Sequence, residues 1–164
     1  MLNPVSPELK IHLETFLPPA AFLEISQKYL TEPRGRYQGS AGILVAPENT
    51  DQVSKIISSA SQAGVGVIPY GGGTGLVGGQ VLPTSQEGAA SPIILSLSRM
   101  CKVRGCHSDE NVLVVEAGVT LAEAQAEAVK VNRLFPLSLT SEGTAQIGGI
   151  LATNAGGVNV LRYG

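Results

Sequence analysis

The 164-residue sequence predicts an α+β fold, and three features of its first half carry this prediction. The apolar runs Ile43–Ala46 and Val65–Tyr70 are typical of buried strands. Between them, Asn49 or Thr50 caps a helix that ends at Gly64, so the segment forms a β-α-β unit with parallel strands and a right-handed crossover. The third feature is a run of glycines directly after the second strand, at the edge where open α/β sheets bind ligands. The face that the helix is expected to bury consists of Val53, Ile56, Ile57 and Ala60.

Two packing helices without visible chemistry are predicted before this unit. Ser6 and Pro7 are typical of the cap and the first position of a helix, which ends at Pro18. A second helix follows and ends at Glu32. The turn Arg34–Gly39 comes next, and its arginines are candidates for facing a phosphate, although solvated loop charges are the commoner case. The apolar stripe expected on the second helix consists of Phe22, Ile25, Tyr29 and Leu30.

The second half of the chain predicts two further strands and one helix. Ile93–Leu97 and Val112–Gly118 are apolar runs typical of strands, and we interpret the polar stretch Arg99–Asn111 as a connection. A capping box at positions 120–123 begins a helix that runs through Val131. The inward face of this helix is expected to consist of Leu121, Ala124, Ala128 and Val129.

Six of the nine residues from Gly71 to Gly79 are glycine. No packed helix or strand tolerates this density, because glycine loses more conformational freedom on folding than any other residue. Backbone N–H groups without neighbouring Cβ atoms can form a concave nest, so a phosphate or pyrophosphate is the expected guest. A flexible surface loop is the alternative, which we disfavour because the strand Val65–Tyr70 anchors one end of the loop.

Residues 73–78 match the G-x-G-x-x-G fingerprint of dinucleotide-binding Rossmann units. The context departs from that fold, because residues 79–88 lack the apolar periodicity of the helix that should follow. The strand Ile93–Leu97 also lacks an acidic residue at its end, and no Walker Gly-Lys-Ser/Thr is present. An NAD-linked Rossmann enzyme is therefore the less favoured alternative.

The composition argues against several classes of protein. A net charge of −2 gives no electrostatic case for binding nucleic acid. No secretory signal and no apolar run of membrane-spanning length is visible, so a cytoplasmic location is expected. Cys101 and Cys106 beside His107 invite a zinc reading, but further ligands at structural spacing are missing and the other histidine is His12. We therefore expect free thiols and no metal site.

Two glycine-containing regions together resemble the FAD-binding domain of the vanillyl-alcohol-oxidase type, also called PCMH-type, and most closely that of D-2-hydroxyacid dehydrogenases. The motifs that carry the resemblance are Pro69 with Gly71–Gly79, Phe135–Leu137, Gly143–Thr144, Ile147–Gly149, Thr153–Gly157 and Arg162–Gly164. One glycine loop alone is a weak signal, but two regions in this order, separated by a strand and a helix, are specific. The resemblance runs from Arg34 to Gly164 and implies a small parallel β-α-β subdomain followed by a second subdomain of mixed or antiparallel strands.

The resemblance also implies which residues bind FAD. The first loop, expected around the pyrophosphate, contributes Pro69, Tyr70, Gly71, Gly72, Gly73, Thr74, Gly75, Leu76 and Gly79. The residues expected along the ribityl chain and the flavin are Pro136, Leu137, Ser138, Gly143 and Thr144. Those expected around the isoalloxazine ring and a neighbouring phosphate are Gly148, Gly149, Thr153, Asn154, Ala155, Gly156 and Gly157. For the four glycines of this last group, tight backbone packing without ligand contact is the alternative.

Two positions depart from the pattern of the family. Ile150 stands where Asn is usual, which puts the polar contact at that point in question, and Tyr70 stands where Arg, His or Gln is usual. Relatives with covalently tethered flavin use a histidine, commonly beside the first loop. His12 and His107 are far in sequence from both glycine regions, so the resemblance implies a dissociable, non-covalent FAD.

For the whole protein, the resemblance implies an FAD-dependent oxidoreductase that oxidises a D-2-hydroxy acid, such as D-lactate, glycolate or D-2-hydroxyglutarate, to the 2-oxo acid. The implied electron acceptor is a quinone, a cytochrome or an electron-transfer flavoprotein rather than NAD. A homo-oligomer and a peripheral position at a membrane are further expectations. A non-catalytic remnant that kept the fold is the alternative.

The domain organisation is expected to be incomplete. Residues 1–33 are predicted to form N-terminal helices and residues 34–164 an FAD-binding domain that is truncated at its C-terminus. The substrate domain, the general base and the metal ligands of the family would then lie beyond Gly164. We accordingly expect the chain alone to be inactive and to bind FAD weakly or not at all.

Overall fold

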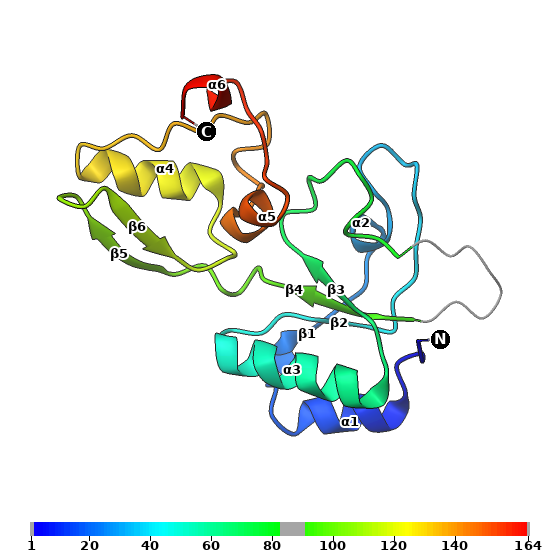
Figure 1. Ribbon diagram of the computed structural model, residues 1–164. Coiled ribbons are helices and arrows are strands. Elements are labelled where there is room, and N and C mark those ends of the chain that lie inside the picture. The colour runs from blue at the N-terminus through cyan, green and yellow to red at the C-terminus, as the bar shows by residue number, and fades with distance from the viewer. Residues whose placement is uncertain (1, 83–90, 164) are drawn as a thin grey trace. The chain divides into compact units, whose positions relative to one another are not determined.

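The computed structural model describes residues 2–82 and 91–163 (Figure 1). The chain divides into two compact units, Met1–Arg99 and Met100–Gly164. The first unit has a four-stranded sheet and the second a two-stranded sheet, each with its own helices. This combination of helices with a mixed and an antiparallel sheet is the α+β fold that the sequence predicts.

The sheet of the first unit has three parallel strands and one antiparallel edge strand. Its strands are β1 (Phe22–Leu23), β2 (Ile43–Val45), β3 (Val67–Tyr70) and β4 (Ile93–Ser96), in the spatial order β1-β2-β4-β3. β2 and β3 both pair parallel with β4, while β1 runs antiparallel to β2. The two strands of the predicted β-α-β unit are therefore parallel, but β4 lies between them and they do not pair with each other.

The prediction of a second N-terminal helix up to Glu32 is wrong in its first half. Only the 3₁₀ turn η1 (Pro19–Ala21) and the short helix α2 (Gln27–Leu30) are helical, and Phe22 and Leu23 form β1. Phe22 pairs with Val45 and Leu23 with Leu44. The two side chains pack into apolar clusters on opposite faces of the sheet, as successive strand residues do. A short apolar run carries too little periodicity to distinguish these two structures.

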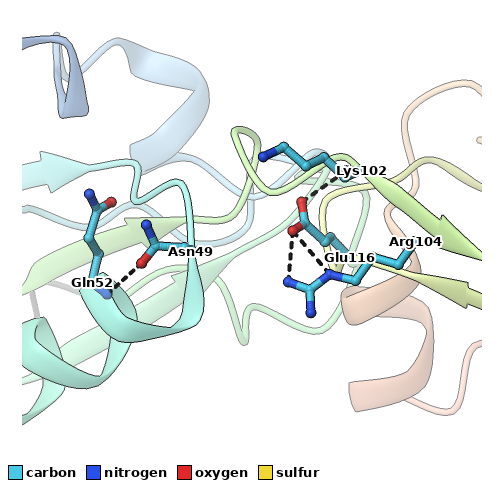
Figure 2. Close-up of polar contacts among 5 residues, drawn as sticks. All are labelled: Asn49, Gln52, Lys102, Arg104 and Glu116. Atoms are coloured by element: carbon cyan, nitrogen blue, oxygen red, sulfur yellow. Dashed lines mark hydrogen bonds and ion pairs between the residues drawn. The ribbon is translucent and has the colours of Figure 1, made fainter.

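The predicted helix caps of the first unit are present. The Ser6 hydroxyl accepts from the Leu9 N–H at the start of α1 (Pro7–Glu14). At the start of α3 (Thr50–Ala63), Asn49 Oδ1 accepts from the Gln52 N–H at 2.9 Å (Figure 2). Gly64 ends α3 in the left-handed conformation, with φ at 67°, as a C-cap glycine should.

The sheet of the first unit has an apolar cluster on each face. Figure 1 shows α1 and α3 on one side, where Leu13 and Ile56 are fully buried against the sheet. On the other face Leu44 and Tyr70 pack against residues of α2. Ile57 is 49% exposed, contrary to the prediction, because each helical residue is rotated by about 100° from the one before it.

The second unit begins with an antiparallel hairpin. The strands β5 (Val103–His107) and β6 (Val112–Val115) pair along their length, with an irregularity between Val103 and Gly105. The prediction that 99–111 is only a connection is wrong, since β5 lies within it. The side chains of β5 are exposed or half-buried and several are polar, so the segment lacks the apolar pattern that predicts a strand. Its pairing with β6 stabilises it.

Glu116 links the two strands at the end of this hairpin that lies away from its turn. Its side chain is 4% exposed, and its carboxylate accepts from the Arg104 Nη2 at 2.8 Å and from the Lys102 N–H at 2.9 Å (Figure 2). These bonds, with that from Arg104 the larger contribution, hold the pKa of Glu116 below its usual range. The carboxylate therefore stays ionised and ties the chain before β5 to the end of β6.

Three helices complete the second unit: α4 (Leu121–Lys130), α5 (Ile147–Ala152) and α6 (Val160–Tyr163). The predicted capping box of α4 is present, with the Thr120 N–H bonded to Glu123 Oε2 at 2.8 Å and the Glu123 N–H bonded to Thr120 Oγ1 at 3.2 Å. Leu121 is fully buried, whereas Val129 is 68% exposed and not inward as predicted. Within residues 2–82 and 91–163, no helix has the length and apolarity needed to cross a membrane.

Candidate cofactor site

The first glycine loop leaves the carboxyl end of β3 and contains no helix between Gly71 and Leu82. Gly73 and Gly78 have φ values of 72° and 79°, a left-handed conformation that L side chains rarely adopt. The loop therefore turns at two positions where glycine is required. Between Gly71 and Leu82 the structure has no Rossmann helix and therefore no helix dipole, so an anion at this loop would be bound by backbone N–H groups.

Tyr70 lies directly under the first half of the loop. Its side chain is buried, its hydroxyl donates to the Lys28 carbonyl at 2.8 Å, and its ring packs on Tyr29 with centroids 4.7 Å apart. A Cβ on Gly73 would lie 2.2 Å from the Tyr70 hydroxyl oxygen. Burial raises the pKa of Tyr70, so the hydroxyl stays protonated and remains a donor. At this position, which departs from the family pattern, the side chain supports the loop from below.

The second half of the loop is held by Tyr37 and Gln80. A Cβ on Gly78 would lie 2.9 Å from Cδ2 of Tyr37, so the ring packs closely against that glycine. Gln80 Nε2 donates to the Gly73 carbonyl at 3.0 Å and thereby closes the loop on itself. A Cβ on Gly79 would meet no atom within 4 Å. The loop is thus supported on one side and open at Gly79.

The remaining predicted residues of the first loop lie around these supports. Pro69 is exposed on β3, and Gly71, Gly72, Thr74 and Gly75 are half-buried. Leu76 is 43% exposed and its neighbour Val77, which we did not predict as a site residue, is 83% exposed. The structure therefore brings together, within the first unit, all the residues predicted around the pyrophosphate.

In the second unit, the segment 136–139 is fixed by bonds to its carbonyl groups. Asn159 Nδ2 donates to the Pro136 carbonyl at 2.8 Å, and Gln125 Nε2 donates to the Leu137 carbonyl at 2.7 Å. The Val158 N–H donates to the Ser138 carbonyl at 3.3 Å. These three bonds fix the carbonyl groups of Pro136, Leu137 and Ser138 within the second unit.

Glu142 ties the same segment to the turn that carries Gly143 and Thr144. Its Oε1 accepts from the Ser138 hydroxyl at 2.9 Å and from the Leu139 N–H at 3.2 Å. Both Gly143 and Thr144 are exposed, and a Cβ on Gly143 would meet no atom within 4 Å. The residues predicted along the ribityl chain are thus joined by a carboxylate that sequence reasoning missed, because no motif marks Glu142.

The region predicted as a second glycine loop begins as a helix, since Gly148 and Gly149 lie within α5. A Cβ on Gly148 would lie 2.7 Å from Cβ of Ala117, and one on Gly157 would lie 2.2 Å from the Ser138 carbonyl oxygen. Tight backbone packing therefore accounts for these two glycines. A Cβ on Gly149 or Gly156 would meet no atom within 4 Å, so packing does not account for those two.

The end of α5 is closed by its own residues. The Thr153 hydroxyl donates to the Gly149 carbonyl at 2.8 Å, and Asn154 adopts a positive φ of 48° after the helix. Ala155 packs against the apolar cluster that contains Leu121 and Ile150. Ile150 is 8% exposed, so the position where the family usually has Asn is filled by a side chain of the core.

Gln146, which precedes α5, was not predicted as a site residue. Its side-chain oxygen Oε1 is buried and accepts no hydrogen bond from the part of the chain that the structure describes. Buried acceptors are normally satisfied, so an orphaned one beside the predicted flavin residues fits a ligand that brings a donor. An amide before an Ile-Gly-Gly sequence gives no signal that could have revealed this.

The cavity of the second unit lies elsewhere. It has a volume of about 340 Å³ and is lined by residues of β5, β6 and α4, together with Arg133 and Phe135. None of the predicted cofactor residues lines it. Across residues 2–82 and 91–163, no three His, Cys, Asp or Glu side chains gather as a metal site would require, and Cys101 and Cys106 are free thiols.

A sheet with three parallel strands, one of which leads into a glycine-rich loop, followed by a unit with a second glycine-containing region, is typical of a nucleotide-binding domain. Residues 41–164 match the FAD binding domain family, and the chain belongs to that family. The chain is 39% identical over 129 residues to a D-2-hydroxyglutarate–pyruvate transhydrogenase of Saccharomyces cerevisiae, a match that covers 79% of this chain and 25% of that protein. It is also 39% identical over 127 residues to the mitochondrial D-2-hydroxyglutarate dehydrogenase of Danio rerio, covering 77% and 23%. The chain thus spans about a quarter of the length of these relatives.

Solved structures of low sequence identity show the same fold. An alkyldihydroxyacetonephosphate synthase superposes with a TM-score of 0.84 at 20% identity, covering 99% of this chain and 32% of that one. The glucose dehydrogenase Phl p 4 superposes with a TM-score of 0.76 at 17% identity, covering 94% and 33%. Together with the family match, these similarities confirm the predicted PCMH-type FAD-binding fold and imply FAD as the cofactor.

Proposed function

We propose that this chain is the FAD-binding part of an oxidoreductase that converts a D-2-hydroxy acid to the 2-oxo acid. The observation that carries the proposal is the first glycine loop, which turns at two left-handed glycines, is supported from one side and is open at Gly79. The similarity to D-2-hydroxyglutarate dehydrogenases, and to a putative D-lactate dehydrogenase of Schizosaccharomyces pombe at 37% identity, supports the choice of substrate class.

The residues present fit FAD. In the proposal, the N–H groups of Gly71–Gly79 hold the pyrophosphate, and the segment 136–139 lies along the ribityl chain. Gly149 and Gly156 give the isoalloxazine ring room, and Gln146 Oε1 accepts a hydrogen bond from the cofactor. When bound, the flavin supplies the hydride-accepting chemistry, while these residues bind and orient it.

We propose that the FAD is not covalently attached. A tether requires a nucleophilic side chain at the flavin, and covalently tethered relatives use a histidine for it. His12 lies on α1 and His107 on β5, and neither belongs to the loop 71–79 or to the segments 136–144 and 146–157. Acid precipitation of the protein should therefore release the flavin into the supernatant.

The catalytic partners of the flavin belong to the same proposal. A general base must lie within hydrogen-bond reach of the substrate hydroxyl, and we place it, with the carboxylate clamp and any metal ligands, in sequence beyond residue 164. The electron acceptor is proposed to be a quinone, a cytochrome or an electron-transfer flavoprotein. The location is proposed to be cytoplasmic or at the periphery of a membrane, and the assembly a homo-oligomer, although several relatives are named as mitochondrial.

A non-catalytic FAD-binding remnant is the second candidate. The observation that favours it is that, among the described residues, no three His, Cys, Asp or Glu side chains gather as a metal site would require. An NAD-linked Rossmann enzyme is disfavoured because no helix begins between Gly71 and Leu82, where the structure describes the glycine loop and the residues that leave it.

The experiment that separates these candidates is a flavin assay on the chain together with the downstream sequence of its gene, which we call the extended chain. The purified extended chain is denatured, and the absorbance of the released cofactor is recorded. FAD near one per chain, with reduction of the flavin by a D-2-hydroxy acid, supports the dehydrogenase. Bound FAD that no D-2-hydroxy acid reduces supports the remnant, and a folded protein that takes up no added FAD contradicts both.

A further inference from the structure

Glu32 is a buried carboxylate at the centre of a turn. It is 1% exposed, and its two oxygens accept from the backbone N–H groups of Arg34 at 3.0 Å and Arg36 at 3.1 Å. Its own N–H donates to the Tyr37 carbonyl at 3.1 Å, and its carbonyl accepts from the Gly35 N–H at 2.7 Å. In the part of the chain that the structure describes, no Lys, Arg or His side chain pairs with this carboxylate.

The turn around Glu32 packs against the first glycine loop. Tyr37 packs against Gly78, and a Cβ on Gly39 would lie 2.2 Å from the Leu82 carbonyl oxygen. Upstream of the turn, the Lys28 carbonyl accepts from the Tyr70 hydroxyl, which lies under Gly73. Residues 28–39, which we call the supporting segment, therefore contact the base, the far half and the exit of the glycine loop.

Burying a carboxylate without a counter-ion is costly, and the two N–H bonds offset that cost only while the turn keeps its shape. The turn and the carboxylate consequently stabilise one conformation of the supporting segment. A glycine-rich loop gains most from such support, because its residues are otherwise the freest in the chain. A loop held in its binding conformation before the ligand arrives binds more tightly, since less ordering is required on binding.

We propose that Glu32 is a positioning residue for the cofactor: its buried carboxylate fixes the supporting segment, and that segment holds Gly73 and Gly78 in the conformation that receives the pyrophosphate. The proposal rests on the proposed FAD site. Glu32 does not touch the phosphate itself, and it acts through Tyr37 and the backbone of the turn.

The test uses Glu32→Gln in the extended chain. Glutamine keeps the volume of the side chain and one acceptor, but it turns an NH₂ group toward one of the two N–H donors. Glu32→Asp keeps the charge and both oxygens, so it should recover part of the loss. Ile56→Val is the matched control, because it removes one methyl group from the core on the other face of the sheet and contacts nothing in the supporting segment.

Two quantities are measured beside thermal stability: the dissociation constant for FAD, and the hydrogen-exchange rates of the amides of residues 71–79 in FAD-free protein. Glu32→Gln should weaken FAD binding about tenfold, as expected for an unsatisfied hydrogen bond to a charged group, and speed exchange in the loop. Ile56→Val should lower stability and leave both quantities unchanged.

The outcomes separate this inference from the proposed function. FAD affinity and loop exchange equal to wild type in Glu32→Gln would overturn the inference, as would equal losses of affinity in Glu32→Gln and Ile56→Val. If the wild-type extended chain binds no FAD, the proposed function fails. The exchange rates then still decide the positioning role, because faster exchange in Glu32→Gln supports it and unchanged exchange overturns it.

Discussion

Replacing Gly73 by alanine tests the geometry of the first glycine loop most directly. Two independent penalties apply at this position. Gly73 has φ at 72°, where an L residue costs roughly 1–2 kcal/mol. Its new Cβ would also lie 2.2 Å from the Tyr70 hydroxyl oxygen, an overlap that costs about 1–3 kcal/mol when neighbours must shift. The sum is about 2–5 kcal/mol.

How this free energy is distributed depends on what yields. If the loop keeps its conformation, Gly73→Ala lowers the free energy of unfolding of the FAD-free extended chain by about 2–5 kcal/mol, measured by urea denaturation. If the loop instead changes its conformation, the same free energy must be spent to restore the binding conformation when FAD binds. The affinity for FAD then falls by about thirtyfold or more, since 1.4 kcal/mol corresponds to a factor of ten. Stability and the dissociation constant for FAD are therefore measured on the same sample.

Tyr70→Phe identifies the overlap as the cause. Removing the hydroxyl costs about 1 kcal/mol through the lost bond to the Lys28 carbonyl, but the nearest ring atom to the new Cβ is then Cζ, at 2.9 Å. The double variant should accordingly lose less than the sum of the two single variants. Gly79→Ala is the control for stability, because its Cβ meets open space and its φ lies outside the left-handed region. Full additivity, or a Gly73→Ala protein with wild-type stability and affinity, would refute the described geometry.

Three further predictions concern the second unit. Glu116→Gln should destabilise the extended chain at pH 7 in urea denaturation, and its difference from wild type should shrink as the solution is acidified: the folded pKa of Glu116 is lowered, so its contribution is complete above the unfolded value of about 4.3 and is lost as the pH falls through the folded pKa. A difference that does not change with pH would contradict this. Ile150→Asn should lower the free energy of unfolding by about 1–3 kcal/mol beyond the effect of Ile150→Val, because it buries an amide in the apolar core; equal stability of the two variants would show a polar partner at that point. Gly148→Ala should destabilise by about 1–3 kcal/mol through its contact with Ala117, whereas Gly149→Ala should leave stability unchanged or raised and weaken FAD binding. The reverse order of stabilities would show that the two glycines are misassigned.

Local signals in the sequence were sufficient where one residue determines the backbone. Asn49, Gly64 and the capping box at 120–123 appear where predicted, because each satisfies backbone groups within a few residues of itself. The glycine loop was recognisable for the same reason, since its composition excludes regular structure.

Predictions that depended on distant partners were less successful. β1 exists because Phe22 and Leu23 find Leu44 and Val45, and β5 exists because β6 follows it, and neither partner is visible in the segment itself. The roles of Tyr70 and Glu32 likewise come from contacts with Lys28 and with the turn around Tyr37. A sequence pattern contains no information on which glycines pack against backbone, as Gly148 and Gly157 do.

The place of β4 in the first sheet determines when that sheet can form. Among the described strands, β2 and β3 do not pair with each other: β3 pairs with β4 alone, and β2 pairs with β1 and with β4, which is the last of the four strands along the chain. In a growing polypeptide β1 and β2 can therefore pair early, but β3 has no strand partner until residues 93–96 become available, and the strand that anchors the glycine loop joins the sheet only then. The strand that lies between β2 and β3 is thus the last of the sheet to be synthesised. The β-α-β segment that precedes it cannot form its parallel pairings on its own, because both of its strands pair with β4.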